Sequence, residues 1–176
     1  CMITATDAAG EQATSSATVM LGNTAPTLSN ISITPSTSVN TSSSLTCSVG
    51  VSDADLESLT PTYTWKKGSN VLGTGATLTL APTIVQPQDT VECMASVTDG
   101  FGATAESSTT VEIGNTDPVI TSVTISPSIS YNDSTLNCGV VSSDADNQSL
   151  TTTYSWTNST TGSALGTSAS ITLDAS

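Results

Sequence analysis

Two short loops hold the carboxylates that could bind an ion. SDADLES and SSDADNQ contain Asp53, Asp55, Glu57, Asp144 and Asp146. Hard cations such as Ca²⁺ bind several converging carboxylate or carbonyl oxygens, and an Asp-x-Asp loop supplies two or three of them. The same side chains can instead cap turns by accepting hydrogen bonds from nearby backbone N–H groups. Calcium binding and turn capping are therefore both open interpretations of these loops.

Covalent modification is the second chemistry that the residues allow. The motif Asn-x-Ser/Thr, which marks N-glycosylation acceptors, occurs at Asn30, Asn40, Asn132, Asn147 and Asn158. A chain with 34 Thr and 30 Ser contains such motifs by chance as well. Asn40 and Asn132 are the favoured candidates, because they occupy matching places in the repeat described below. Surfaces rich in Ser and Thr can also carry O-linked sugar.

Catalysis and nucleic-acid binding are not expected. The chain has no histidine, so Ser-His-Asp and Cys-His arrangements cannot form. Its 15 acidic residues against two lysines give a net charge of −13, whereas binding to nucleic acid or an anionic membrane needs Lys and Arg to neutralise phosphate. We expect that the protein is not an enzyme.

The composition indicates an extracellular protein built from strands. No apolar run approaches the roughly 20 residues of a membrane-spanning helix. Four cysteines in a chain with almost no lysine and abundant Thr favour an oxidising compartment. We therefore expect an extracellular or cell-surface location.

An internal repeat is the strongest signal in the sequence. GNTAPTLSNISITPS (22–36) recurs as GNTDPVITSVTISPS (114–128), an offset of 92 residues. LTCSVGVSDADLESLTPTYTW (45–65) recurs as LNCGVVSSDADNQSLTTTYSW (136–156), an offset of 91 residues. The period is thus about 92 residues, with single-residue insertions or deletions in loops.

The period divides the chain into three parts. Residues 1–23 match the last quarter of a repeat, 24–115 form one complete repeat, and 116–176 match the first two-thirds of another. Cys1 aligns with Cys93, so Cys1 is expected on the sixth strand of a repeat. The chain reads as two turns of a longer array.

Alternating apolar residues predict about seven short strands in the complete repeat. Turn-forming residues separate them, and no stretch shows helical periodicity. The strand markers are Ile31 and Ile33; Leu45, Cys47, Val49 and Val51; Tyr63 and Trp65; Val71 and Leu72; Leu78 and Leu80; Val91, Cys93, Ala95 and Val97; Val111 and Ile113. Seven short strands in about 90 residues are typical of a β-sandwich.

The combined motifs resemble the tandem immunoglobulin-like and PKD-like repeats of large secreted bacterial surface proteins. They include N-T-A/D-P, L-T-C, D-A-D, T-Y-x-W, D-T-V-x-C and V-T-D-G, and they extend over all 176 residues. The resemblance implies an all-β chain of tandem immunoglobulin-like sandwiches: strands F and G in residues 1–23, a full domain in 24–115, and strands A to E in 116–176.

The resemblance also assigns the cysteines and tryptophans. The order Cys47…Trp65…Cys93 is that of an inter-sheet disulfide packed on a buried Trp, with Trp156 as the second core Trp. Closing this 46-residue separation contributes about 4 kcal/mol on a chain-entropy basis. The partners expected for Cys1 and Cys138 lie in an adjacent repeat or in a partner chain.

Sandwich topology brings the acidic loop and the linker to one pole of the domain. The loops after strands two and six both lie beside the N-terminus of a domain. We therefore expect Asp53, Asp55 and Asp99 to meet the linker 23–26 where one domain joins its predecessor, with Asp144 and Asp146 at the corresponding place in the next repeat.

These observations favour a structural role, as part of an extracellular fibre or stalk of domains joined head to tail. Two assemblies remain open: one continuous chain, which we favour, or subunits in which residues 1–23 complete the open sandwich 116–176 of a neighbour by strand addition. In the second assembly Cys1 pairs with Cys138 of that neighbour. The alternative function is an adhesin or carbohydrate-binding surface module.

Overall fold

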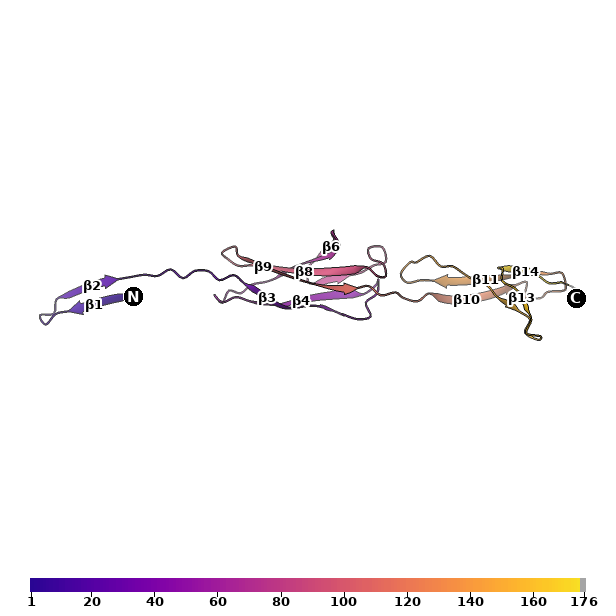
Figure 1. The fold of residues 1–176 in the computed structure, drawn as a ribbon, viewed down its shortest axis with the longest axis horizontal. Coiled ribbons are helices and arrows are strands. Elements are labelled where there is room, and N and C mark those ends of the chain that lie inside the picture. Colours follow the sequence, from indigo (N-terminus) through magenta and orange to yellow (C-terminus); the bar gives the residue numbers. More distant parts are fainter. Residues whose placement is uncertain (175–176) are drawn as a thin grey trace.

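The computed structural model describes residues 1–174, and these residues form strands and turns with no helix. Three parts follow one another along a single long axis (Figure 1). An N-terminal hairpin comes first, then a central unit with two sheets, then a C-terminal unit with shorter sheets. The expectation of an all-β chain is confirmed.

The N-terminal hairpin stands apart from the central unit. Strands β1 (Met2–Thr6) and β2 (Gln12–Ser16) pair antiparallel, and every residue of both strands is exposed. Asp7 closes the turn, because its Oδ1 accepts hydrogen bonds from the N–H groups of Ala9 and Glu11. A two-stranded hairpin with no covered face has little packing to stabilise it.

Two sheets make up the central unit. The first has the order β3-β4-β7 and the second the order β6-β5-β8-β9. Their bounds are β3 (Thr27–Thr34), β4 (Ser44–Ser52), β5 (Thr62–Lys67), β6 (Asn70–Thr74), β7 (Thr77–Thr79), β8 (Thr90–Thr98) and β9 (Thr104–Glu112). Strands β4 and β8 alternate buried and more exposed residues along their length, as strands with one covered face do.

One hydrophobic core joins the two sheets. Its buried members come from both sheets and the loops between them: Ile33, Val39, Leu45, Cys47, Trp65, Leu78, Leu80, Val85, Val91, Cys93, Val111 and Ile113. The disulfide between Cys47 on β4 and Cys93 on β8 crosses this core. The expected Cys47–Cys93 pairing is therefore confirmed.

The C-terminal unit has a similar beginning and fewer paired strands. Its first sheet has the order β10-β11-β14, and a separate pair is formed by β12 and β13. The bounds are β10 (Val119–Ser126), β11 (Thr135–Ser143), β12 (Trp156–Thr157), β13 (Ala164–Gly166) and β14 (Ser170–Thr172). The order β10-β11-β14 parallels β3-β4-β7 of the central unit.

The strand around Tyr154 and Trp156 is shorter than its central counterpart. β5 pairs with β8 along Thr62–Lys66, whereas no strand of residues 1–174 pairs with the segment before Trp156, and only Trp156 and Thr157 are in strand conformation. An extended segment without a partner loses its ladder hydrogen bonds on that side.

The described residues contain no helix long and apolar enough to cross a lipid bilayer.

Replacement of Trp65 tests the central core. Trp65 is fully buried, and its indole N–H donates to the Gly75 carbonyl at 2.9 Å. We expect Trp65→Ala to lower the free energy of unfolding by about 3–5 kcal/mol, measured by urea denaturation of the oxidised chain. The matched control is Phe101→Ala, which removes a ring that is 75% exposed and should change stability by less than about 0.5 kcal/mol. Equal losses in both variants would contradict the assigned core.

Candidate functional site

The linker before the central unit is held by two aspartates. The Asn23 side-chain amide donates to Asp99 Oδ2 at 2.8 Å, and the backbone N–H of Thr24 donates to Asp55 Oδ2 at 2.7 Å. Asp99 lies in the turn between β8 and β9, and Asp55 lies in the loop after β4. The structure thus places the acidic loop and the linker together at this pole of the unit.

Three carboxylates gather beside that linker. Asp53, Glu57 and Asp99 each offer one oxygen within 4.8 Å of the others. Asp55 stands outside this group, because its carboxylate binds the linker. Such a group could contribute oxygen ligands to a hard cation such as Ca²⁺. The expected calcium residues therefore separate: Asp53 and Asp99 converge with Glu57, while Asp55 has another partner.

Backbone donors occupy one oxygen of each of these carboxylates. Asp99 Oδ1 accepts from the N–H groups of Phe101 and Ala103 at 2.9 and 2.8 Å. The N–H of Gly100 donates to Glu57 at 3.3 Å, and Asp53 Oδ1 accepts from the N–H of Asp55. Only Asp53 Oδ2, among buried side-chain oxygens and nitrogens of residues 1–174, lacks a hydrogen-bond partner. Turn capping thus accounts for one oxygen of each carboxylate.

The second junction is built on Asp146. Its Oδ2 accepts from the N–H of Thr116 at 2.6 Å, and its other oxygen accepts from the Thr41 hydroxyl. Asp144 Oδ1 accepts from the N–H groups of Asp146 and Gln148. In the described part of the chain, Asp144 and Asp146 do not belong to a group of three or more potential metal ligands. Asp144 caps its own loop, and Asp146 makes the junction contacts.

Sequence reasoning missed Thr41. This side chain is buried in the loop between β3 and β4 and binds a carboxylate 105 residues further along the chain. Nothing in the local sequence marks it, because its partner belongs to the next unit. The same loop also holds the linker, since the N–H of Gly114 donates to the Val39 carbonyl at 2.7 Å.

These hydrogen bonds stabilise the charged forms of both junction aspartates. The Asn23 amide, with the backbone N–H groups of Ala103 and Phe101, holds the pKa of Asp99 below its ordinary value of 3.8, against the opposing effect of burial. The Thr41 hydroxyl and the Thr116 N–H lower the pKa of Asp146 in the same way. Both carboxylates are therefore acceptors at neutral pH.

The other two cysteines are free thiols at different places in the chain. Cys1 is exposed at the start of the N-terminal hairpin, and Cys138 is half-buried on β11.

Trp156 is buried and donates its indole N–H to the Ser168 carbonyl at 2.8 Å, much as Trp65 does to Gly75. Phe101 and Tyr131, the exposed aromatic residues, lie on different units.

The glycosylation motifs differ in accessibility. Asn30, Asn132, Asn147 and Asn158 are exposed, whereas Asn40 is half-buried. The Asn40 side-chain oxygen accepts hydrogen bonds from Ser42 and Ser43, so it holds the loop between β3 and β4. Of the two favoured positions, Asn132 is the accessible one.

Comparison of the chain with protein-family models, with curated proteins and with solved structures gave no match.

Acid titration tests the role of Asp99. Because its pKa is lowered in the folded state, the unfolded chain binds the proton more readily, and stability falls as pH drops from about 4 through the folded pKa. We expect Asp99→Asn to lower Tm at pH 6. The substituted side chain has a single acceptor oxygen, so it cannot accept both from the Asn23 amide and from the backbone N–H groups that bind the other oxygen. The variant should also show a smaller fall in Tm between pH 4 and 2. Glu106→Gln, an exposed position on β9, is the control and should keep the wild-type curve.

Proposed function

We propose that this chain is a structural component of an extracellular fibre or stalk, in which immunoglobulin-like β-sandwich units follow one another head to tail. The observation that carries the proposal is the construction of the two junctions. Each linker is short and is bound by the aspartates of the unit that follows it: Thr24 by Asp55, and Thr116 by Asp146. A linker fastened in this way limits the swing between units.

The contact across the second junction supports the same role. Thr41 of the central unit binds Asp146 of the C-terminal unit, and Asp146 also binds the linker between them. One buried carboxylate therefore contacts both units and the connection. Charge-assisted hydrogen bonds of this kind are stronger than bonds between neutral groups, and units that contact mainly their neighbours stack into extended arrays.

The covalent and surface properties fit a fibre outside the cell. The Cys47–Cys93 disulfide joins the two sheets of the central unit, and disulfides persist in oxidising compartments. The net charge of −13 keeps a long rod soluble by mutual repulsion. A core with few large side chains gains stability from the cross-link.

Location on the producing cells tests this function. Antibodies raised against residues 24–115 should label filaments outside unpermeabilised cells in immunogold electron microscopy. A cytosolic protein, labelled only after permeabilisation, is the control. Label that is confined to the cell interior, or scattered outside without filaments, would overturn the proposal.

Mechanical pulling tests the load-bearing role of the disulfide. In single-molecule force spectroscopy the oxidised central unit should release only the chain outside the Cys47–Cys93 loop. Reduction should add the 46 residues of that loop, which corresponds to about 15–17 nm of extra contour length. A Cys47→Ser variant should show the longer extension without reductant. Equal extension before and after reduction would show that the disulfide does not limit stretching.

A further inference from the structure

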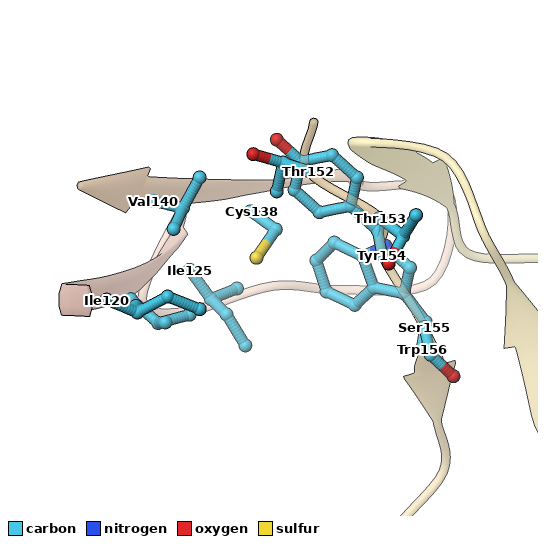
Figure 2. Close-up of a pocket in the computed structure, with 10 residues that line it drawn as sticks. Ile120, Ile125, Cys138, Val140, Thr152, Thr153, Tyr154, Ser155 and Trp156 are labelled. Atoms are coloured by element: carbon cyan, nitrogen blue, oxygen red, sulfur yellow. The ribbon is translucent and has the colours of Figure 1, made fainter. Parts of the chain in front are cut away.

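The C-terminal unit carries an open apolar groove. A cavity of about 310 Å³ lies between β10, β11 and the segment of Tyr154 and Trp156. Ile120 and Ile125 are 63% and 56% exposed on its wall. Figure 2 shows the Cys138 side chain among these residues, with its sulfur directed toward the space between Ile125 and the aromatic rings. The groove thus combines exposed apolar surface with a free thiol.

The central unit shows what fills the corresponding place in a complete repeat. There β5 pairs with β8, β8 pairs with β9, and Cys93 on β8 is bonded to Cys47 on β4. Ile33, which aligns with Ile125, is only 5% exposed beneath these strands. The C-terminal unit has counterparts of β4 and β5 around Cys138 and Trp156, and no counterpart of β8 or β9 within the described residues.

A strand pair that aligns with β8 and β9 lies at the other end of the described chain. β1 and β2 align with the second part of β8 and the first part of β9 at an offset of 92 residues, and Cys1 aligns with Cys93. Val19 and Leu21 are 85% and 91% exposed, whereas their aligned residues Val111 and Ile113 are 6% and 1% exposed. The N-terminal segment therefore presents apolar side chains that a complete repeat buries.

The N-terminal hairpin cannot reach the apolar groove of its own molecule. The hairpin and the C-terminal unit lie at opposite ends of the rod, with the central unit between them (Figure 1). Within residues 1–174, this pairing is therefore available only between two copies. A donor at one end and an acceptor at the other make a heterologous contact, which gives an open filament when its rotation does not close a ring. The two ends lie on one long axis (Figure 1), which favours the filament.

We propose that residues 1–23 of one copy fill the groove of residues 116–176 of a second copy, and that Cys1 forms a disulfide with Cys138 across the contact. This inference rests on the proposed fibre function and names its partner as a second copy of the chain. The register follows from the central unit, where Trp65 is opposite Cys93 and Tyr63 is opposite Ala95. Accordingly, Trp156 lies opposite Cys1, and Tyr154 lies opposite Ile3.

The covalent step is a thiol–disulfide exchange with a small disulfide oxidant such as oxidised glutathione. A thiolate of Cys1 or Cys138 attacks the oxidant and releases one reduced thiol. The second protein thiolate then attacks the mixed disulfide and releases the other. Two protein thiols are oxidised, one oxidant disulfide is reduced to two thiols, and one Cys1–Cys138 bond forms.

Oxidation of the purified 1–176 chain tests the pairing. With oxidised glutathione, a non-reducing denaturing gel should show a ladder in steps of 17.6 kDa that collapses on reduction. Peptide mapping by mass spectrometry should find Cys1 joined to Cys138. A chain that stays monomeric with both thiols free would overturn the proposal.

Two single-cysteine variants exclude random thiol oxidation. Cys1→Ser retains the acceptor thiol, and Cys138→Ser retains the donor thiol. Each variant alone should remain a covalent monomer, whereas an equimolar mixture should give one covalent dimer and nothing larger. Dimers that form as readily in either variant alone as in the mixture would overturn the assignment of donor and acceptor.

A charge on the inward face tests the apolar contact. Ile3→Asp should reduce the yield of the ladder at least about tenfold, because it would bury an unpaired carboxylate in the groove. Thr4→Asp is the matched control: it adds the same charge to the adjacent position, which faces outward, and should leave the yield within about twofold. Near-ultraviolet circular dichroism checks that the central unit stays folded, since the hairpin lies outside its core. Equal yields would overturn strand insertion.

The outcomes separate this inference from the proposed function. Extracellular filaments without a ladder would remove the strand exchange and leave the fibre role. A ladder without extracellular label would leave the strand exchange and remove the fibre role.

Discussion

The pairing of β8 with β5, cross-linked through Cys93 to Cys47 on the opposite sheet, is the contact on which the central unit depends. It places β8 over the core, brings β9 alongside, and covers Trp65 and Ile33. In the C-terminal unit, no strand within residues 1–174 pairs with the segment before Trp156, and Ile125 is exposed. The difference between the two units is therefore the presence or absence of one strand pair.

At both junctions a few polar groups bind the linker. In both linkers the second Asp of the D-A-D motif accepts the N–H of a linker threonine. The first Asp of each motif, Asp53 or Asp144, caps the loop by accepting the N–H of the second Asp. The loop cap and the linker contact therefore lie two residues apart. The cluster of Asp53, Glu57 and Asp99 lies beside this contact, so a change in the charge of that cluster would act directly on the linker.

Much of the fold could be read from the sequence, because alternation of apolar residues directly reports which face of a strand is covered. The markers Val91 to Val97 and Leu45 to Val51 correspond to β8 and β4. The candidate site was less predictable. Asp53, Asp55 and Asp99 were identified as a group, yet Asp55 binds the linker and Glu57 takes its place near the other two. Spacing along the chain shows which carboxylates can meet, and the path of the loop decides which of them do.

The sequence alone determined the 92-residue period, the strand pattern and the alignment of Cys1 with Cys93, because these are properties of residue order. Only the tertiary structure decided that Val19, Leu21 and Ile125 are exposed while their aligned residues in the central unit are buried. It alone placed Thr41 on Asp146, across 105 residues. The physical reason is that burial and long-range hydrogen bonds depend on which strands are present to pair, and the same residues face a core in one unit and solvent in the other.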